Sequence, residues 1–442
     1  MRDKVTIDLS RQYQILKMSD LYTYEGKIDQ IIGMTVEATG IACNIGDVCN
    51  IMIGSDENKK GILAEVVGFK ANKVLLMPYQ DIDGIGYGSI VRNTGDKLMI
   101  KMSNDLIGRT VDALGNPIDN GEPIGGEAYY PINGAPSNPM DRPRIDTPIE
   151  MGVKAIDGLL TIGKGQRMGI FAGSGVGKST LMGMIARNVK ADVNVIALVG
   201  ERGREVVEFI KRDLGPEGVK RSVLVVATSD QPAMMRSKCA LTATTIAEYF
   251  RDQGKDVLLM MDSLTRFAMA QREIGLNVGE PPVARGYTPS IYSALPKLLE
   301  RSGNFETGSI TGIYTVLVEG DDSNEPISDT VRGIIDGHIM LSRKVAMKNH
   351  YPAIDVLSSV SRLMSEIAEP EHSSTAGRMR NLMALYQENQ DLISIGAYKS
   401  GTNPELDYAI SHIQAINQFL QQEVDKKFDF ADTVELMIKA IE

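Results

Sequence analysis

The chain has 442 residues, 43% hydrophobic and 24% charged, which are the proportions of a soluble globular protein with a substantial core. This length predicts two or three domains, and 57 acidic against 47 basic residues disfavour a broad nucleic-acid-binding face. We therefore expect no nucleic acid among the partners. Three sparse cysteines, no signal-peptide core and no apolar run of membrane-spanning length predict a cytoplasmic protein without a transmembrane segment.

The first 150 residues predict three successive parts. Residues 1–24 carry a few apolar side chains at helical spacing, which favours a short amphipathic segment. Residues 25–102 contain short apolar runs between glycine turns, such as GILAEVVGF and KVLLMPY, and predict a small β-barrel or sandwich. Residues 103–150 are rich in Gly, Pro, Asn and Asp, which is typical of a long connector.

Residues 151–368 alternate continuous apolar runs with helical stretches, which predicts a parallel sheet covered by helices. The chain as a whole is therefore expected to be a multidomain α/β protein. The predicted strands are NVIALV (194–199), VLVVAT (223–228), VLLMMD (257–262), GIYTVLVE (312–319) and HIMLS (338–342).

Residues 369–442 predict only helices. Asn403 followed by Pro404 is a favourable helix start, and apolar residues keep helical spacing after it. We expect a second helix over residues 432–442, begun by Asp432 and Glu435 as a capping pair.

The stretch FAGSGVGKST (171–180) lies between a predicted strand and a predicted helix and matches a phosphate-binding loop. Backbone N–H groups and the positive end of the helix dipole would face one concavity. Lys178 can reach the β- and γ-phosphates, and the Ser179 hydroxyl can bind Mg²⁺. Ala172 replaces the glycine of the strict pattern and also keeps the turn narrow. The predicted nucleotide-binding residues are Gly173, Ser174, Gly175, Val176, Gly177, Lys178, Ser179 and Thr180.

Two carboxylates follow predicted strands of the same sheet. Asp262 ends VLLMMD, and beside a phosphate loop it is expected to position Mg²⁺. Glu201 follows NVIALV, where ligands bind in open α/β sheets, and it could orient the attacking water. Taken alone, Glu201 could equally be a surface ion-pair partner of Arg202 or Arg204.

Several motifs occur in a fixed order that resembles one family: FAGSGVGKST, GERGREV, DSLTRFAMAQREIGLNVGEPP, RGYTPSIYSALPKLLER, VEGDDSNEPISDTVRGIIDGHIMLSR and HYPAIDVLSSVSRLM. From about Glu25 to its end, the chain resembles the export ATPases of bacterial flagella and type III secretion systems. These are relatives of the catalytic subunits of rotary ATP synthases. The resemblance implies an N-terminal β-barrel, a central P-loop ATPase domain and a C-terminal helical domain.

The resemblance also implies roles for individual residues, with ATP and Mg²⁺ as the bound groups. Glu201 matches the family's catalytic carboxylate, and Tyr351 matches its adenine-stacking aromatic. Arg362, in SSVSRLM, matches the arginine finger that acts on the neighbouring subunit's ATP. The structural alternatives are a core tyrosine at Tyr351 and, for Arg362, an ion pair with Glu366.

The function implied is an ATP-hydrolysing motor subunit of the flagellar export apparatus, which energises delivery and unfolding of substrates at the membrane gate. The family implies a homohexamer, a coiled-coil stalk protein in the ring, a negative regulator at residues 1–24 and substrate–chaperone complexes. It also implies a peripheral association with the cytoplasmic face of the membrane export apparatus.

The alternative functions are an injectisome ATPase, a rotary synthase-type subunit and an RNA translocase. AGSGVGKST is closer to flagellar members than to an injectisome ATPase. A rotary synthase-type subunit fits less well, because DSLTRFAMAQREIG is export-like. An RNA translocase would need clustered basic residues in its barrel, and residues 25–102 carry none.

Overall fold

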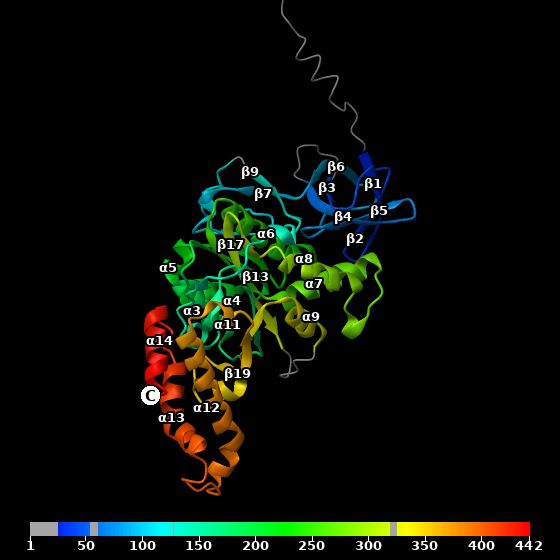
Figure 1. The fold of residues 1–442 in the computed structure, drawn as a ribbon. Helices are drawn as coiled ribbons and strands as arrows, with labels where there is room; N and C mark the ends of the chain where they lie inside the picture. Colours follow the sequence, from blue (N-terminus) through cyan, green and yellow to red (C-terminus); the bar gives the residue numbers. More distant parts are fainter. Residues whose placement is uncertain (1–24, 54–60, 127, 319–324) are drawn as a thin grey trace, which may run out of the picture. The chain divides into compact units, whose positions relative to one another are not determined.

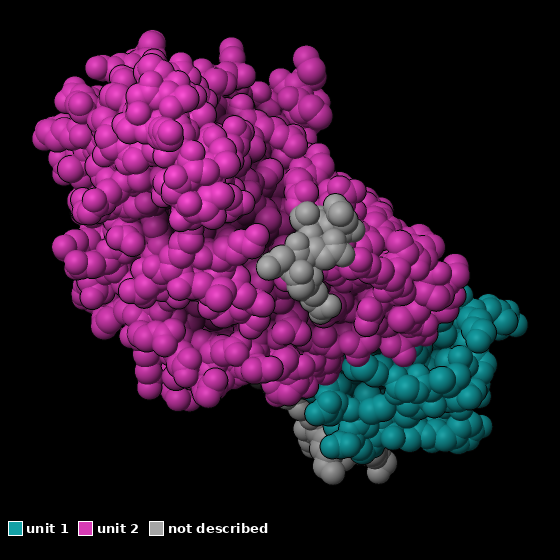
Figure 2. Space-filling view, turned by 90° about the horizontal axis from the view of Figure 1, so that it is seen from below, with its two compact units in different colours: residues 1–98 teal, residues 99–442 magenta. Residues whose placement is uncertain are grey.

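The computed structural model describes residues 25–53, 61–126, 128–318 and 325–442 (Figure 1). The chain divides into two compact units, residues 1–98 and residues 99–442, drawn teal and magenta in Figure 2. The amphipathic segment predicted within residues 1–24 lies outside the described residues. Among the described residues, no helix combines the length and the apolar character needed to cross a membrane.

The first unit contains a closed antiparallel barrel with strand order β1-β2-β5-β4-β3-β6. Closure pairs Gly26 of β1 with Val91 of β6 and leaves no free sheet edge. Side chains that alternate along the strands, such as Val36, Ala38 and Val66, are fully buried inside. The strands are β1 (Glu25–Ile32), β2 (Thr35–Thr39), β3 (Asp47–Ile51), β4 (Ile62–Lys70), β5 (Lys73–Pro78) and β6 (Ile90–Lys97).

The second unit is organised by one large sheet with the order β19-β18-β12-β17-β15-β13-β14-β8, and β16 pairs with β17 off this path. All neighbours from β18 to β8 are parallel, and β19 is antiparallel to β18. The parallel sheet is therefore confirmed. Its strands are β8 (Thr110–Val111), β12 (Arg167–Ala172), β13 (Val193–Glu201), β14 (Ser222–Thr228), β15 (Asp256–Asp262), β16 (Gly303–Phe305), β17 (Gly308–Leu317), β18 (Gly337–Leu341) and β19 (Ile354–Ser361).

Helices cover both faces of this sheet because its apolar strands must be buried on both sides. Alternate strand residues such as Ile170, Leu198 and Leu224 join α3 in the main core, while α6 packs on the other face of β13, β14 and β15. The helical elements are α2 (Lys154–Leu159), α3 (Lys178–Asn188), α4 (Gly203–Glu208), the π-helical η3 (Phe209–Leu214), α5 (Gly215–Lys220), α6 (Ala233–Asp252), α7 (Leu264–Val278), α8 (Pro289–Leu299), α9 (Pro326–Ile334), α10 (Arg343–Met347) and α11 (Met364–Ile367).

The segment expected as a connector contributes short elements of its own. It contains η1 (Asn104–Leu106), β8, β9 (Ala128–Pro131), η2 (Pro139–Asp141) and β10 (Pro148–Ile149). β9 pairs with β7 (Met99–Met102), β10 pairs with β11 (Ile162–Gly163), and a further 3-10 turn, η4, spans Ala284–Gly286. β8 forms an edge of the large sheet. The sequence does not predict this strand, because the connector segment 103–150 consists largely of turn-forming residues.

The chain ends in three mutually packed helices, α12 (Pro370–Ser394), α13 (Pro404–Leu420) and α14 (Phe430–Lys439). As predicted, Asn403 caps α13, where its side chain accepts from the N–H groups of Glu405 and Leu406. The cap expected for the last helix was wrong. Asp429 accepts from the N–H of Asp432 at 2.8 Å, so α14 begins two residues before Asp432.

Helix α3 packs closely against η3, and a glycine permits the contact. A Cβ added to Gly183 would lie 2.4 Å from the Asp213 carbonyl oxygen, which belongs to backbone and cannot move aside easily. Gly377, in the middle of α12, is exposed, and an added Cβ would meet no atom within 4 Å.

We expect Gly183→Ala to lower the free energy of unfolding by about 1–3 kcal/mol, because overpacking outweighs the gain in helix propensity. The matched control, Gly377→Ala, should raise it by roughly 0.5–1 kcal/mol. Urea denaturation of both variants measures the difference. Equal stabilisation by the two alanines would contradict the close approach of α3 and η3.

Candidate nucleotide-binding site

The phosphate loop joins the end of β12 at Ala172 to the start of α3 at Lys178. Gly175 and Gly177 have φ values of 79° and 91°, a left-handed region that side chains rarely adopt. Val176 is buried and anchors the loop, while Ser174 and Gly175 are exposed. The loop thus presents its backbone at the N-terminus of α3, which is the geometry that binds phosphate.

The strand order brings the two predicted carboxylates to this loop. Asp262 ends β15, and Glu201 ends β13, the next strand of the sheet. Because β12, β17, β15 and β13 are all parallel, their carboxyl ends meet at one edge. Thr315, on the intervening strand β17, donates its hydroxyl to Asp262 Oδ1 at 2.7 Å.

Lys178 lies between these carboxylates. Its Nζ is 2.5 Å from Asp262 Oδ1 and 3.8 Å from Glu201 Oε1. The side chains of Lys178 and Glu201 are each 13% exposed, and that of Asp262 is 6% exposed. The structure therefore brings together the three residues expected to bind phosphate (Lys178), position the metal (Asp262) and orient the attacking water (Glu201).

The charges in this cluster shift two pKa values in the same direction. Burial lowers the pKa of Lys178, but the charges of Asp262 and Glu201 outweigh it, and the pKa is raised above its ordinary value. For Glu201, burial and then the charge of Asp262 raise the pKa to about 7, against the opposing attraction of Lys178. The cluster holds one cation between two acids, one of which is easily protonated.

Ser179, Glu201 and Asp262 line one small cavity of about 20 Å³ beside the loop. A hydroxyl and carboxylates are the oxygen donors that suit Mg²⁺. The described parts of the chain contain no group of three or more His, Cys, Asp or Glu side chains that could hold a metal. The residues present thus fit a Mg²⁺ ion that completes its coordination with phosphate oxygens and water.

Tyr351 lies next to the phosphate loop, as expected for a base-stacking residue. A Cβ added to Gly177 would lie 3.7 Å from its ring, and the Tyr351 side chain remains 42% exposed. Both residues line a pocket of about 840 Å³ that also includes Thr180, and this volume accommodates a nucleoside.

The rest of this pocket comes from residues that the sequence did not single out. They include Lys154 at the start of α2 and, in the segment after α13, Gln422, Lys426 and Phe428. The sequence around Phe428 does not predict base binding, because only the packing of the C-terminal helices brings this ring close to the phosphate loop.

Arg362 lies far from the phosphate loop of its own chain. It follows β19, whose last residue, Ser361, pairs with Gly337 at the first residue of β18. Because β18 runs parallel to β12, Arg362 lies at the amino ends of these strands and the loop lies at their carboxyl ends. The separation along β12 is roughly 17 Å. Arg362 therefore cannot act on a nucleotide in its own loop.

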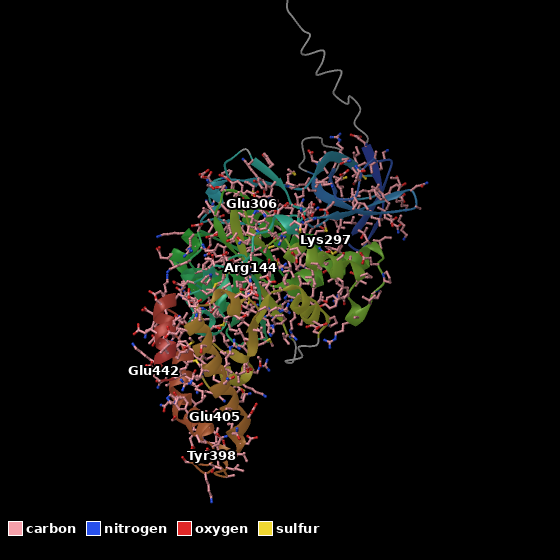
Figure 3. All side chains as sticks on the ribbon, in the orientation of Figure 1. Arg144, Lys297, Glu306, Tyr398, Glu405 and Glu442 are labelled. Carbon is pink, nitrogen blue, oxygen red and sulfur yellow. The ribbon has the colours of Figure 1, made fainter. Side chains whose placement is uncertain are left out.

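The structural alternative for Arg362 was an ion pair with Glu366. The Glu366 carboxylate instead pairs with Arg144, labelled in Figure 3, at 2.7 Å. The Arg362 side chain is exposed, and its Nη2 donates to the Arg332 carbonyl at 3.3 Å, at the end of α9. Arg362 is thus presented at the surface without the predicted carboxylate partner.

The fold and the site together define a P-loop nucleoside triphosphatase. The ATP synthase alpha/beta family matches with its nucleotide-binding domain at residues 152–361 and its beta-barrel domain at residues 28–95. The T3SS EscN ATPase C-terminal domain matches residues 368–439. The chain belongs to the family of flagellum-specific ATP synthases and type 3 secretion system ATPases.

The relatives are similar along nearly their whole length. The flagellum-specific ATP synthase of Bacillus subtilis is 56% identical over 93% of this chain and 94% of its own. The type 3 secretion system ATPase of Xanthomonas euvesicatoria is 48% identical over 97% of this chain and 96% of its own. The solved structure of the assembled ATPase EscN from the enteropathogenic E. coli type III secretion system has a TM-score of 0.89 and 46% identity, covering 94% of this chain and 100% of EscN.

The raised pKa of Glu201 predicts a pH-dependent effect on stability. The folded protein binds this proton more tightly than the unfolded chain does, so Glu201 lowers stability as pH rises from about 4.5 to about 7. We expect Glu201→Gln to raise the free energy of unfolding by roughly 1–3 kcal/mol at pH 8 and to change it little at pH 5. Chemical denaturation at the two pH values measures this.

The control is Glu217→Gln, at a side chain that is 83% exposed, which should change stability little at either pH. If Glu201→Gln has the same effect at pH 5 and pH 8, the carboxylate is not the desolvated group described above.

Proposed function

We propose that the chain is the ATP-hydrolysing subunit of a flagellar protein export apparatus, energising the delivery and unfolding of substrates at the membrane gate. The observation that carries the proposal is the convergence of Lys178, Glu201 and Asp262 beside a phosphate loop. The flagellum-specific ATP synthases of Bacillus subtilis and Treponema pallidum, which are 56% and 50% identical to this chain, support the flagellar assignment.

Within the chain, each residue of the site has a distinct role in this proposal. The backbone of residues 173–180 and the Lys178 ammonium bind the phosphates, and Lys178 leaves Asp262 when they arrive. Ser179 and Asp262 would hold Mg²⁺, which supplies charge neutralisation at the phosphate oxygens. Glu201 accepts a hydrogen bond from the attacking water and orients it toward the γ-phosphate. Tyr351 stacks on the base.

Arg362 completes the site of a neighbouring copy of the chain. Its planar guanidinium would stabilise the charge that develops on the transferred phosphoryl group. Since Arg362 lies at the opposite end of β12 from its own loop, this role requires assembly. A homohexamer is the assembly we propose; relatives solved as the assembled ATPase EscN, alone and with its central stalk EscO, support a ring and a coiled-coil stalk partner.

The remaining parts of the proposal concern partners and location. A negative regulator would bind residues 1–24, and substrate–chaperone complexes and the export gate would be met at the cytoplasmic face of the membrane. The injectisome ATPase is the second candidate, because type 3 secretion system ATPases are 44–48% identical to this chain.

Lys178→Ala and Glu201→Gln should fail in different ways. Loss of the Lys178 charge removes a phosphate contact, so we expect ATP affinity to fall about tenfold or more. Glu201→Gln keeps the size of the side chain and removes only the water-orienting carboxylate, so ATP should bind and hydrolysis should fall by roughly two orders of magnitude or more. Fluorescent-nucleotide binding and phosphate release, measured side by side, separate the two.

The same variants test the biological assignment in the source bacterium. Replacement of the chromosomal copy by Lys178→Ala should stop the export of flagellar hook and filament subunits. Normal flagellar export together with lost secretion of injectisome needle subunits would favour the second candidate. A Glu201→Gln protein that hydrolyses ATP at the wild-type rate would remove Glu201 from the mechanism.

Mixing two inactive variants tests the role of Arg362. In rings that contain both Lys178→Ala and Arg362→Ala subunits, some interfaces unite an intact loop with an intact arginine. We therefore expect partial ATPase activity to return on mixing, although each variant alone is nearly inactive. If co-assembled subunits, verified by differently tagged copies, recover no activity, Arg362 does not act across the interface.

A further inference from the structure

Gln422, two residues after the end of α13, is a buried residue whose side-chain amide and backbone N–H are all hydrogen-bonded. The residue is 7% exposed. Its Oε1 accepts from the N–H of Lys154 at 2.9 Å, and its Nε2 donates to the carbonyls of Gly152 at 2.9 Å and Lys426 at 2.8 Å. Its backbone N–H donates to the Tyr351 carbonyl at 3.0 Å. One residue thus connects three segments that are far apart in the sequence.

The partners of Gln422 surround the proposed base pocket. Lys154, Tyr351 and Lys426 all line it, and so does Phe428, two residues beyond Lys426. The Lys154 ammonium lies over the Phe428 ring at 4.7 Å from its centroid. The lysine whose backbone is held by Gln422 therefore also contacts the aromatic ring of the same segment.

The segment from Gln421 to Phe428 has no helix or strand to fix its shape. Its anchors include the bonds of Gln422, a hydrogen bond from Arg187 of α3 to the Val424 carbonyl at 2.7 Å, a turn closed by the Lys426 N–H, and an ion pair of Lys427 with Glu150 at 3.9 Å. Irregular backbone without such bonds samples many conformations. Among these anchors, Gln422 is the one that bonds both the Tyr351 backbone and the segment that carries Phe428, so the position of Phe428 relative to Tyr351 depends in part on it.

We propose that Gln422 is a positioning residue for the nucleotide base, holding Tyr351 and the 421–428 segment in the arrangement that stacks on it. The inference rests on the proposed nucleotide site. Because Gln422 lies two residues after the end of α13, it also makes the affinity for the base depend on the placement of the C-terminal helices, whereas the phosphate loop precedes α3 at the other end of the site.

Gln422→Leu keeps the volume of the side chain and removes its hydrogen bonds. We expect KM for ATP to rise about tenfold, because stacking of a base on aromatic rings is lost. The inhibition constant of inorganic pyrophosphate, which has no base, should stay within twofold of wild type, and kcat should change little. Gln422→Asn, which retains an amide on a shorter arm, should shift KM in the same direction by less and covers the case that the leucine variant does not fold.

Two further variants make the outcome decisive. Gln418→Leu is the same chemical change on the exposed face of α13 and should alter neither constant. Tyr351→Ala should raise KM for ATP and leave pyrophosphate inhibition unchanged. If Tyr351→Ala does so and Gln422→Leu does not, the positioning role is wrong. If Gln422→Leu weakens pyrophosphate equally, its effect is general and the proposal falls. If Tyr351→Ala leaves KM unchanged, the base site itself is wrong.

Discussion

The buried ammonium of Lys178 is the group on which the rest of the site depends. It lies 2.5 Å from Asp262 and 3.8 Å from Glu201, in a setting where burial alone would oppose its charge. The two carboxylates keep it protonated, and it in turn moderates the repulsion between them. In the proposed site a triphosphate would compete with these acids for the same cation, so that nucleotide binding and the release of Asp262, the proposed metal ligand, would be linked by one charge.

The arrangement of strands supplies this cluster with its geometry. Parallel neighbours end at one edge of a sheet, and the order β12-β17-β15-β13 places the loop, Thr315, Asp262 and Glu201 side by side there. The nucleoside end of the site is built differently. Tyr351, Lys154 and Phe428 come from three separate segments, and hydrogen bonds of Gln422 hold two of these to the third. The proposed phosphate site is therefore formed at the edge of the sheet, whereas the proposed base site is formed where the C-terminal segment packs beside the loop.

Arg362 lies at the opposite end of β12 from the phosphate loop, so its proposed role would make the activity of the site depend on assembly. Arg362 is exposed beside the end of α9, and the carboxylate expected to pair with it is bound by Arg144. Within the described parts of the chain no ion pair engages this guanidinium, which would leave it available to a phosphate of another subunit in the proposed assembly. This division of the site between subunits would make hydrolysis respond to the arrangement of the ring.

The sequence by itself determined the phosphate loop and the strands β12, β13, β14, β15, β17 and β18, and it predicted roles for Lys178, Ser179 and Asp262, because each is a local pattern in or next to a strand. The start of α13 at Asn403 could likewise be predicted from a local pattern. The cap of α14 could not: Asp429 caps this helix in place of the expected Asp432, because the residue that caps a helix depends on the direction from which the preceding segment approaches it. Only the tertiary structure decided which strands are neighbours, that Glu201 reaches Lys178, and that Gln422 and Phe428 lie at the base pocket. Those contacts join residues up to 270 positions apart in the sequence. Their distances are set by tertiary packing, which the spacing of neighbouring residues does not predict.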